Sequence, residues 1–269
     1  MNNIIMIPEE KLAEIILTSR DAIMSMESGP FIESAITDKT AFIGDTHCAV
    51  DVTEKVFKNY SHFNKIVFLG DYVDRGDTGV ENLVLILSRL IEEPDKIVVL
   101  RGNHESPRPN KKYGFYEEVL GKYGEDIYPK FSDLFSILPY ATVVNGYFCV
   151  HGGIASKLRN VTEIKKLPLH DKVPGNATAF ELLWNDPRDN ITGFTPNSRG
   201  DNIYYYGNDA VNSFLENNNL NGIIRGHETA DGFNDSKNGK VTTVFSSRYH
   251  GLRAGALRME NGKFYRDYL

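Results

Sequence analysis

The sequence predicts an α/β protein in which helices cover a mixed β-sheet. Residues 65–69 and 97–100 are short apolar runs of strand length, and the segment between them has helical periodicity. This strand–helix–strand order implies parallel neighbouring strands joined by a right-handed crossover. Nearer the C-terminus, Asn238-Gly239 and Asn261-Gly262 are typical of two-residue hairpin turns and indicate antiparallel strands in the last third of the chain.

Length and composition are those of an ordinary globular protein. We expect one catalytic domain spanning residues 1–269, because candidate site residues extend from Asp45 to His250 and must meet in space. The net charge of −6 argues against a general nucleic-acid-binding protein. No apolar run reaches the length of a membrane span, and the N-terminus is acidic where a signal peptide would be basic. We therefore expect a cytoplasmic protein without nucleic-acid or membrane partners.

The N-terminal segment is predicted to be helical. Apolar residues recur at helical spacing from residue 8 to about residue 24, and a weaker helical pattern follows Gly29-Pro30. We interpret residues 8–38 as docking helices that pack on the rest of the domain and take no part in its chemistry.

Five apolar runs are predicted to be buried strands, and a glycine lies beside the carboxyl end of each. In chain order they are residues 41–43, 65–69, 97–100, 147–150 and 222–224. Helices are predicted over residues 80–91 and 111–138 and again near residues 180–184 and 211–215, whereas residues 154–176 are predicted to form a long loop. A further strand is predicted over residues 241–246.

Residues that can bind a metal ion follow all five strands. They are Asp45 and His47, Asp71, Asn103 and His104, His151, and His227. Any one histidine could be an ordinary core or surface residue, but the same setting recurs five times. Because ligands bind at the carboxyl ends of the strands in open α/β sheets, we expect these residues to share one site. Glycines beside them allow sharp turns and a close approach of the backbone.

The mixture of candidate ligands indicates the kind of metal. Of these candidates, two carboxylates, an amide oxygen and three of the imidazoles make a ligand set that suits Mn, Fe, Zn or Co better than Mg or Ca, which prefer oxygen ligands. Six protein ligands are too many for one catalytic ion with an open position. They fit two divalent ions that share a carboxylate. We expect Mn to be the most readily used ion in vitro.

These residues lie in motifs with a recognisable order and spacing. The motifs are Gly44-Asp45-x-His47, Gly70-Asp71-x-Val73-Asp74-Arg75-Gly76, Gly102-Asn103-His104-Glu105, His151-Gly152-Gly153 and Arg225-Gly226-His227. Together they resemble the signature of the phosphoprotein phosphatases, the serine/threonine protein phosphatase family of the calcineurin-like metallophosphoesterase fold. Residues 182–187 and 197–200 resemble later segments of that family, and the match extends over about residues 10–265. The resemblance implies a central mixed β-sandwich flanked by α-helices in four αββα layers.

The resemblance also implies roles for the metal ligands. Asp45 and His47 would bind one ion, and Asp71 would bridge both. The second ion would be bound by Asn103, His151 and His227.

The remaining matched residues would bind phosphate and transfer a proton. Arg75 and Arg199 would hold phosphate oxygens, with Asn103 and Tyr249 beside them. His104 would donate a proton to the leaving alcohol, and Asp74 would orient its imidazole. The implied reaction is hydrolysis of phosphoserine or phosphothreonine esters by direct attack of a water or hydroxide that bridges two metal ions.

Two positions depart from the family pattern. Cys48 stands where a glycine usually follows the first histidine, so we expect the backbone there to avoid positive φ. His250 stands where eukaryotic members often carry a cysteine, and it could be a distant polar neighbour of the site or an unrelated loop residue.

Two alternatives to a protein phosphatase remain open at this stage. One is a relative that cleaves dinucleoside polyphosphates or small phosphoesters, although such relatives tend to begin near the first Asp-x-His motif. The other is a catalytically inactive phosphopeptide-binding scaffold, which would need a missing ligand or acid, and none is missing. For a phosphatase, the expected partners are phosphoprotein substrates and regulatory subunits whose identity the sequence does not indicate.

Overall fold

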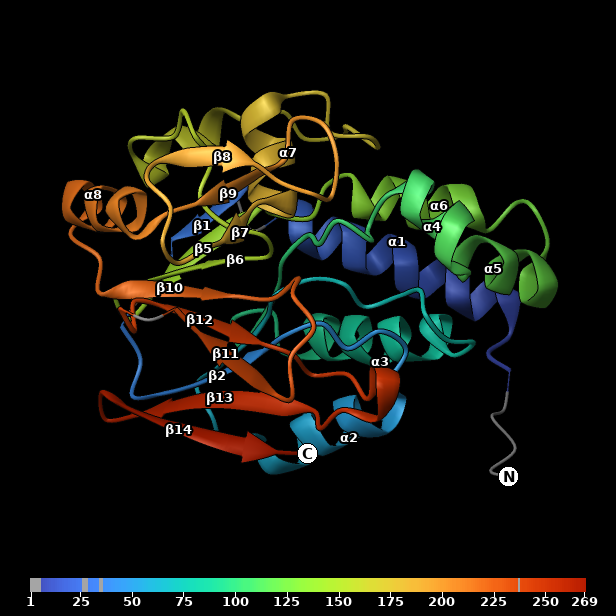
Figure 1. The fold of residues 1–269 in the computed structure, drawn as a ribbon. Coiled ribbons are helices and arrows are strands. Elements are labelled where there is room, and N and C mark those ends of the chain that lie inside the picture. Colours follow the sequence, from blue (N-terminus) through green and yellow to red (C-terminus); the bar gives the residue numbers. More distant parts are fainter. Residues whose placement is uncertain (1–5, 26–28, 34–35, 237) are drawn as a thin grey trace.

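The computed structural model describes residues 6–25, 29–33, 36–236 and 238–269, which form two β-sheets packed face to face (Figure 1). The first sheet has the order β1-β5-β6-β10-β12-β11 and the second has the order β14-β13-β2-β3-β4. The first contains β1 (Phe31–Glu33), β5 (Ala141–Val144), β6 (Tyr147–Val150), β10 (Gly222–Arg225), β11 (Phe233–Asp235) and β12 (Val241–Val244). The second contains β2 (Lys39–Ile43), β3 (Lys65–Phe68), β4 (Ile97–Val99), β13 (Gly255–Glu260) and β14 (Lys263–Tyr268).

Helices cover the outer faces of both sheets. One group consists of α1 (Glu9–Ser25), α2 (Val50–Asn59), α3 (Gly79–Glu92), α4 (Pro107–Tyr113), α5 (Phe115–Tyr123) and α6 (Tyr128–Phe135). The other consists of α7 (Ala177–Trp184) and α8 (Asn208–Asn218). In Figure 1, α1 and α3–α6 gather on the side of the molecule away from α8. A small third sheet of β7 (Asp186–Pro187), β8 (Phe194–Pro196) and β9 (Tyr204–Tyr206) lies beside α7.

Successive side chains along a strand point to opposite faces of the sheet, which explains the layers. In β2, Phe42 belongs to the core between the sheets, whereas Ala41 and Ile43 pack with the helices of the first group. In β3, Val67 points inward and Ile66 outward in the same way. Strands buried on both faces appear in the sequence as continuous apolar runs, which is why the five runs could be recognised. The four-layer αββα fold expected from the sequence is confirmed.

Parallel pairing brings the important strand ends together. β3 lies between β2 and β4 and pairs in parallel with both, and β10 pairs in parallel with β6 and β12. The expectation that the last third of the chain is antiparallel is therefore wrong for β10. It is correct for the pairs β11–β12 and β13–β14. The β13–β14 turn has the expected form, with positive φ at Asn261 (48°) and Gly262 (76°).

Several elements differ from the expectation. Residues 31–33, expected to be helical, form β1 because pairing with β5 outweighs the weak local pattern, while residues 34–35 lie outside the described part. The helical region expected over residues 111–138 is divided among three helices, with positive φ at Gly114 (117°) and Gly124 (81°) between them. Helix α2 and strand β5 were not predicted. A 3₁₀ helix at Val161–Lys166 interrupts the long loop, and another occupies Tyr249–Gly251.

Candidate metal centre

The candidate ligands come from both sheets and meet between the sheets' carboxyl ends. Asp45, Asp71 and Asn103 follow β2, β3 and β4 of one sheet, whereas His151 and His227 follow β6 and β10 of the other. The sheets are joined here by a parallel bridge between Asp45 and Phe245. The amide of Ser246 also donates to the Asp45 carbonyl at 3.1 Å. The close approach requires Gly44, because a Cβ there would lie 1.8 Å from the Val244 carbonyl oxygen.

The residues surround a small polar pocket of about 100 Å³. Its lining consists of Asp45, His47, Asp71, Arg75, Asn103, His104, Tyr113, Trp184, Arg199, His227, Thr229, Phe245 and Tyr249. A larger cavity of about 300 Å³ lies at the amino ends of β3 and β4, but its lining is mostly aliphatic and includes no histidine. The smaller pocket is therefore the candidate site.

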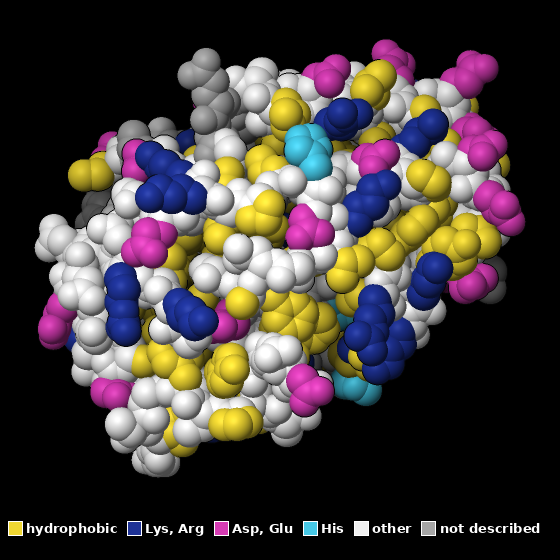
Figure 2. Space-filling view, turned by 90° about the horizontal axis from the view of Figure 1, so that it is seen from above, with side chains coloured by type: hydrophobic (Ala, Val, Ile, Leu, Met, Phe, Trp, Pro, Cys, Tyr) yellow, Lys and Arg dark blue, Asp and Glu magenta, His cyan; other side chains and the backbone are white. Residues whose placement is uncertain are grey.

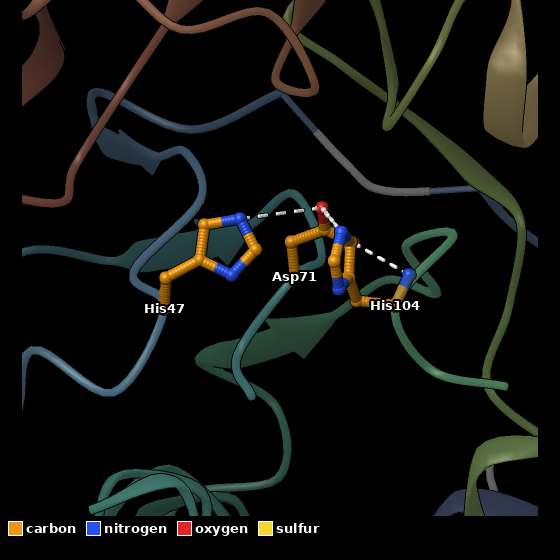
Figure 3. Close-up of side chains that lie close together, drawn as sticks. All are labelled: His47, Asp71 and His104. Atoms are coloured by element: carbon orange, nitrogen blue, oxygen red, sulfur yellow. Dashed lines mark hydrogen bonds and ion pairs between the residues drawn. The ribbon is translucent and has the colours of Figure 1, made fainter. Parts of the chain in front are cut away.

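One cluster of ligating atoms is formed by His47, Asp71 and His104 (Figure 3). Nε2 of His47 lies 3.7 Å from Asp71 Oδ2 and 4.0 Å from Asp45 Oδ2. Nε2 of His104 lies 3.9 Å from the same Asp71 oxygen. Asp45 and His47 thus lie side by side. His47 has a φ of 39° and is not extended, so a turn produces this juxtaposition.

A second cluster is formed by Asp71, His151 and His227. Nε2 of His151 lies 3.3 Å from Asp71 Oδ1 and 2.8 Å from Asn103 Oδ1. Asp71 therefore takes part in both clusters, with one oxygen toward each. This is the position in which a carboxylate can bind two ions.

Backbone carbonyls fix the orientation of two of the imidazoles. Nδ1 of His47 donates to the Val73 carbonyl at 2.8 Å, and Nδ1 of His151 donates to the Leu69 carbonyl at 2.9 Å. A carbonyl oxygen can only accept, so both rings carry a proton on Nδ1, and Nε2 is the nitrogen directed at the ligand clusters. This is the tautomer that binds a metal through Nε2.

Burial has unequal effects on the acids and bases of the site. Burial, together with the nearby Asp71 charge, raises the pKa of Asp45 to about 6. Burial alone would also raise the pKa of Asp71, but His151 and His104 hold it well below its ordinary value. Burial and the neighbouring His104 lower the pKa of His47 to about 4, so this imidazole is neutral. Two crowded carboxylates beside the neutral His47 imidazole favour a bound cation.

The residues present fit divalent metal ions. His227 Nε2 is buried and has no hydrogen-bond partner among the described residues, although an unpaired buried polar atom is costly. Burial and the nearby Arg199 charge also hold the pKa of His227 well below its ordinary value, so this ring is neutral and can bind a metal ion. Together with Asp71 and His151, it forms a ligand set of nitrogen and oxygen atoms that suits transition-metal ions.

Backbone strain is concentrated around the pocket. Six non-glycine residues here have positive φ, namely His47, Cys48, Asp71, Asp74, Arg75 and His227. Each such residue costs on the order of 1 kcal/mol, and strain of this kind gathers at functional sites. Cys48 has a φ of 65°, so the expectation that its backbone avoids positive φ was wrong. Its thiol donates to the Asp74 carbonyl at 3.2 Å, and Gly76 leaves room for its Cβ.

His104 is held by a buried carboxylate. Its Nδ1 lies 2.6 Å from Asp74 Oδ2, and Asp74 also accepts from the Asn110 side chain at 3.1 Å and the Phe115 amide at 2.9 Å. Burial alone would lower the pKa of His104, but Asp71 and Asp74 raise it above the ordinary value. The imidazole therefore carries a proton and faces the pocket with Nε2. No sequence signal identified Asn110 as part of this arrangement.

Two arginines lie at the pocket. Arg75 stacks over the Tyr113 ring at 3.9 Å and donates to the Tyr249 hydroxyl at 3.2 Å. Arg199 Nε donates to Asp186 Oδ2 at 2.6 Å, which fixes its guanidinium at the pocket wall. His250 is exposed and packs against the Tyr249 ring, tilted by 53° to it, outside the pocket lining. All of the expected site residues thus line or adjoin one pocket, and His250 does not.

Comparison with known proteins identifies the family. The family model described as calcineurin-like phosphoesterase matches residues 39–230. The chain belongs to this family. Within the part of the chain that the structure describes, no helix is long and apolar enough to span a membrane.

The most informative relatives place this phosphoesterase among the serine/threonine protein phosphatases. The serine/threonine-protein phosphatase 4 catalytic subunit of Eremothecium gossypii is 31% identical, over 93% of this chain and 80% of its own. A protein phosphatase 2A catalytic subunit of Dictyostelium discoideum is 33% identical, with the same coverage. A solved protein serine/threonine phosphatase from Saccharomyces cerevisiae, described as similar to human phosphatase PP5, superposes with a TM-score of 0.88. It is 29% identical, over 98% of this chain and 90% of its own.

Glu105 is a residue of this phosphoesterase site to which sequence reasoning gave no role, although it lies in one of the quoted motifs. Its buried carboxylate accepts three backbone N–H groups, from Asp71 at 2.8 Å, Tyr72 at 2.9 Å and Gly102 at 2.8 Å. Glu105 thereby joins the loops that follow β3 and β4 and fixes Asp71 in its left-handed conformation, with a φ of 59°.

We expect Glu105→Gln to lower the free energy of unfolding by about 1–3 kcal/mol and to reduce metal retention. The amide has one acceptor oxygen for three donors, and its NH₂ group would oppose a backbone N–H. Chemical denaturation and elemental analysis measure the two effects. Glu117→Gln, at an exposed position on α5, is the matched control and should change neither quantity. Unchanged stability and metal content in Glu105→Gln would contradict the role given to this carboxylate.

Proposed function

We propose that this protein hydrolyses phosphoserine and phosphothreonine esters of proteins with the help of two divalent metal ions. The observation that carries the proposal is the meeting of two ligand clusters at a shared carboxylate, Asp71, in a pocket that also holds Arg75 and Arg199. The names of the relatives supply the substrate class. Their description as catalytic subunits supports regulatory subunits as partners.

For the metals, we assign Asp45 and His47 to one ion, Asp71 to both, and Asn103, His151 and His227 to the other. The distances within the two clusters support this division. Mn, Fe, Zn and Co suit the ligand atoms, with Mn the expected ion in vitro. Bound ions would supply positive charge to the phosphoryl oxygens and lower the pKa of a water molecule.

Substrate binding is assigned to the arginines. Arg75 and Arg199 approach the pocket from different loops and would hold the phosphoryl oxygens, with Asn103 and the Tyr249 hydroxyl beside them. Because a guanidinium stays charged at all ordinary pH values, it neutralises the charge of the equatorial oxygens in the transition state. Arg199 is already positioned by Asp186.

Proton transfer is assigned to His104. Although its Nε2 is close enough to Asp71 to be counted with the first ligand cluster, its pairing with Asp74 favours the protonated ring. A protonated imidazole cannot bind a metal through Nε2, but it can give that proton to the departing serine or threonine oxygen. General acid catalysis of this kind contributes about 10²–10⁴-fold.

We also propose that residues 1–269 form one catalytic domain. Within it, α1 is a docking element. Helix α1 packs against α3 and α6, and its buried residues join the same core as the outer face of β2, β3 and β4. The segment thus supports the sheet that carries Asp45 and Asp71 and contributes no residue to the pocket lining.

The first test compares a phosphothreonine peptide with diadenosine tetraphosphate after chelation and return of Mn, Zn, Fe or Mg. We expect Mn to restore turnover of the peptide. Faster turnover of the dinucleotide would mean that the substrate is a nucleotide, hydrolysed by the same site residues. Absence of turnover of either, with metal bound, would favour an inactive phosphopeptide-binding protein.

We expect His104→Asn to keep its metal content and to lose about 10²–10⁴-fold in turnover of alkyl phosphoesters. The loss on aryl phosphates should be much smaller, because a phenolate leaves without full protonation. Steady-state kinetics on a phosphoserine peptide and on p-nitrophenyl phosphate measure the difference. Asp74→Asn should show the same pattern in weaker form. Equal losses on the two substrates would exclude His104 as the acid.

We expect Asp71→Asn to lower the metal content as well as the rate, because a neutral amide replaces the carboxylate that both clusters share. Elemental analysis of purified protein measures the content, and circular dichroism checks that the variant is folded. Two ions retained per chain would contradict a bridging role for Asp71.

A further inference from the structure

Helix α4 presents an uncompensated group of cations on the surface. Arg108, Lys111 and Lys112 are exposed and lie at i, i+3 and i+4, so they share one face of the helix. None of them forms an ion pair or hydrogen bond with a carboxylate among the described residues. In Figure 2, which looks down on the side of the molecule that carries α4, Lys and Arg side chains gather in one group at the lower right. Like charges at this spacing repel, which favours a partner of opposite charge.

Nearby acidic residues do not neutralise this group. Glu118 on α5 binds Lys122 at 2.9 Å and accepts from the amides of Gly79 and Val80. Glu81 on α3 also pairs with Lys122, at 2.8 Å. Glu117 is exposed on α5 and lies beyond ion-pair distance of the three cations. Lys122 thus engages Glu81 and Glu118, and within the described part of the chain the α4 cations have no carboxylate partner.

One aromatic ring connects α4 to the proposed catalytic pocket. Tyr113, the last residue of α4, lines the pocket, and its ring lies 5.1 Å from the His104 ring. Arg75 lies over the same ring at 3.9 Å, and the Lys112 ammonium lies 5.0 Å from its centroid. Lys111 lies 5.3 Å from the Tyr116 ring, farther from the pocket. The positive charge of the phosphate-binding Arg75 therefore continues outward along α4.

We propose that the α4 cations, Arg108, Lys111 and Lys112, bind acidic residues that flank the phosphorylated residue of a protein substrate. This inference rests on the proposed function and adds a substrate preference to it. Lys112 lies 5.0 Å from the centroid of the Tyr113 ring, which lines the pocket. Because an extended peptide advances about 3.3 Å per residue, carboxylates about two to four residues from the phosphorylated position would reach α4. Each exposed pair adds a modest gain, and three pairs together raise kcat/KM by about 3- to 30-fold.

The test uses three peptides with the same phosphothreonine core. Three Glu residues precede the phosphothreonine in the first, follow it in the second, and are replaced by Gln in the third. We expect one of the acidic peptides to exceed the Gln peptide by about 3- to 30-fold in kcat/KM at low salt, with the advantage falling as salt is raised. In Lys111→Gln/Lys112→Gln, most of the advantage should disappear, while turnover of p-nitrophenyl phosphate stays within about twofold of the wild-type rate.

The control variant is Lys55→Gln/Lys58→Gln. These lysines are exposed on α2, at the opposite side of the molecule from α4 in Figure 1, and the variant should keep the acidic preference. Equal kcat/KM for all three peptides, or an undiminished preference in the α4 variant, would overturn this inference and leave the proposed function intact. Hydrolysis of p-nitrophenyl phosphate without hydrolysis of any peptide would overturn both.

Discussion

The geometry of the site depends on the carboxylate of Glu105. It lies at the base of the loops that follow β3 and β4 and accepts N–H groups from both, which holds two separate turns in one arrangement. Asp71 can then keep a left-handed backbone conformation and direct one oxygen toward each ligand cluster. Without a group that accepts several donors at once, these buried amides would be left unpaired, and each would cost about 1–3 kcal/mol. A buried carboxylate outside the pocket lining thus determines where the proposed chemistry takes place.

The two-sheet architecture explains why the ligands are so far apart in the sequence. One sheet supplies the carboxylates and the other supplies His151 and His227, so the site exists only when the sheets are closed against each other. The two sheets approach each other too closely for a side chain at either position. Gly44 packs directly on the backbone of Val244, and a Cβ on Gly226 would lie 2.4 Å from an oxygen of Asp45. The glycines beside the strand ends therefore let two backbones approach, and side chains of the candidate site, such as Asp45 and Asp71, occupy the space that the absent Cβ atoms leave.

Much of this could be predicted because buried strands and their terminal residues are local patterns. Continuous apolar runs indicated the strands, and the recurrence of Asp, Asn and His after each run indicated a common site. What could not be predicted was set by tertiary contacts. Residues 31–33 become a strand only through pairing with β5, and Cys48 tolerates a φ of 65° only because Gly76 gives its side chain room. The Asn110 side chain donates to the Asp74 carboxylate and to the His104 carbonyl, and no spacing in the sequence predicts this contact.

The net charge of the whole chain says little about the charges around the pocket. A net charge of −6 describes the average surface, yet Arg75 and Arg199 line the pocket. The acidic excess is partly consumed inside the protein, where Asp71, Asp74 and Glu105 are buried and hold backbone and imidazole groups. The cations of α4 and Arg75, by contrast, remain exposed to solvent. Over a distance of about 8–10 Å in physiological salt, a ligand responds to these nearby charges and hardly at all to the total. The surface beside the pocket is thus suited to anionic substrates even though the protein as a whole is acidic.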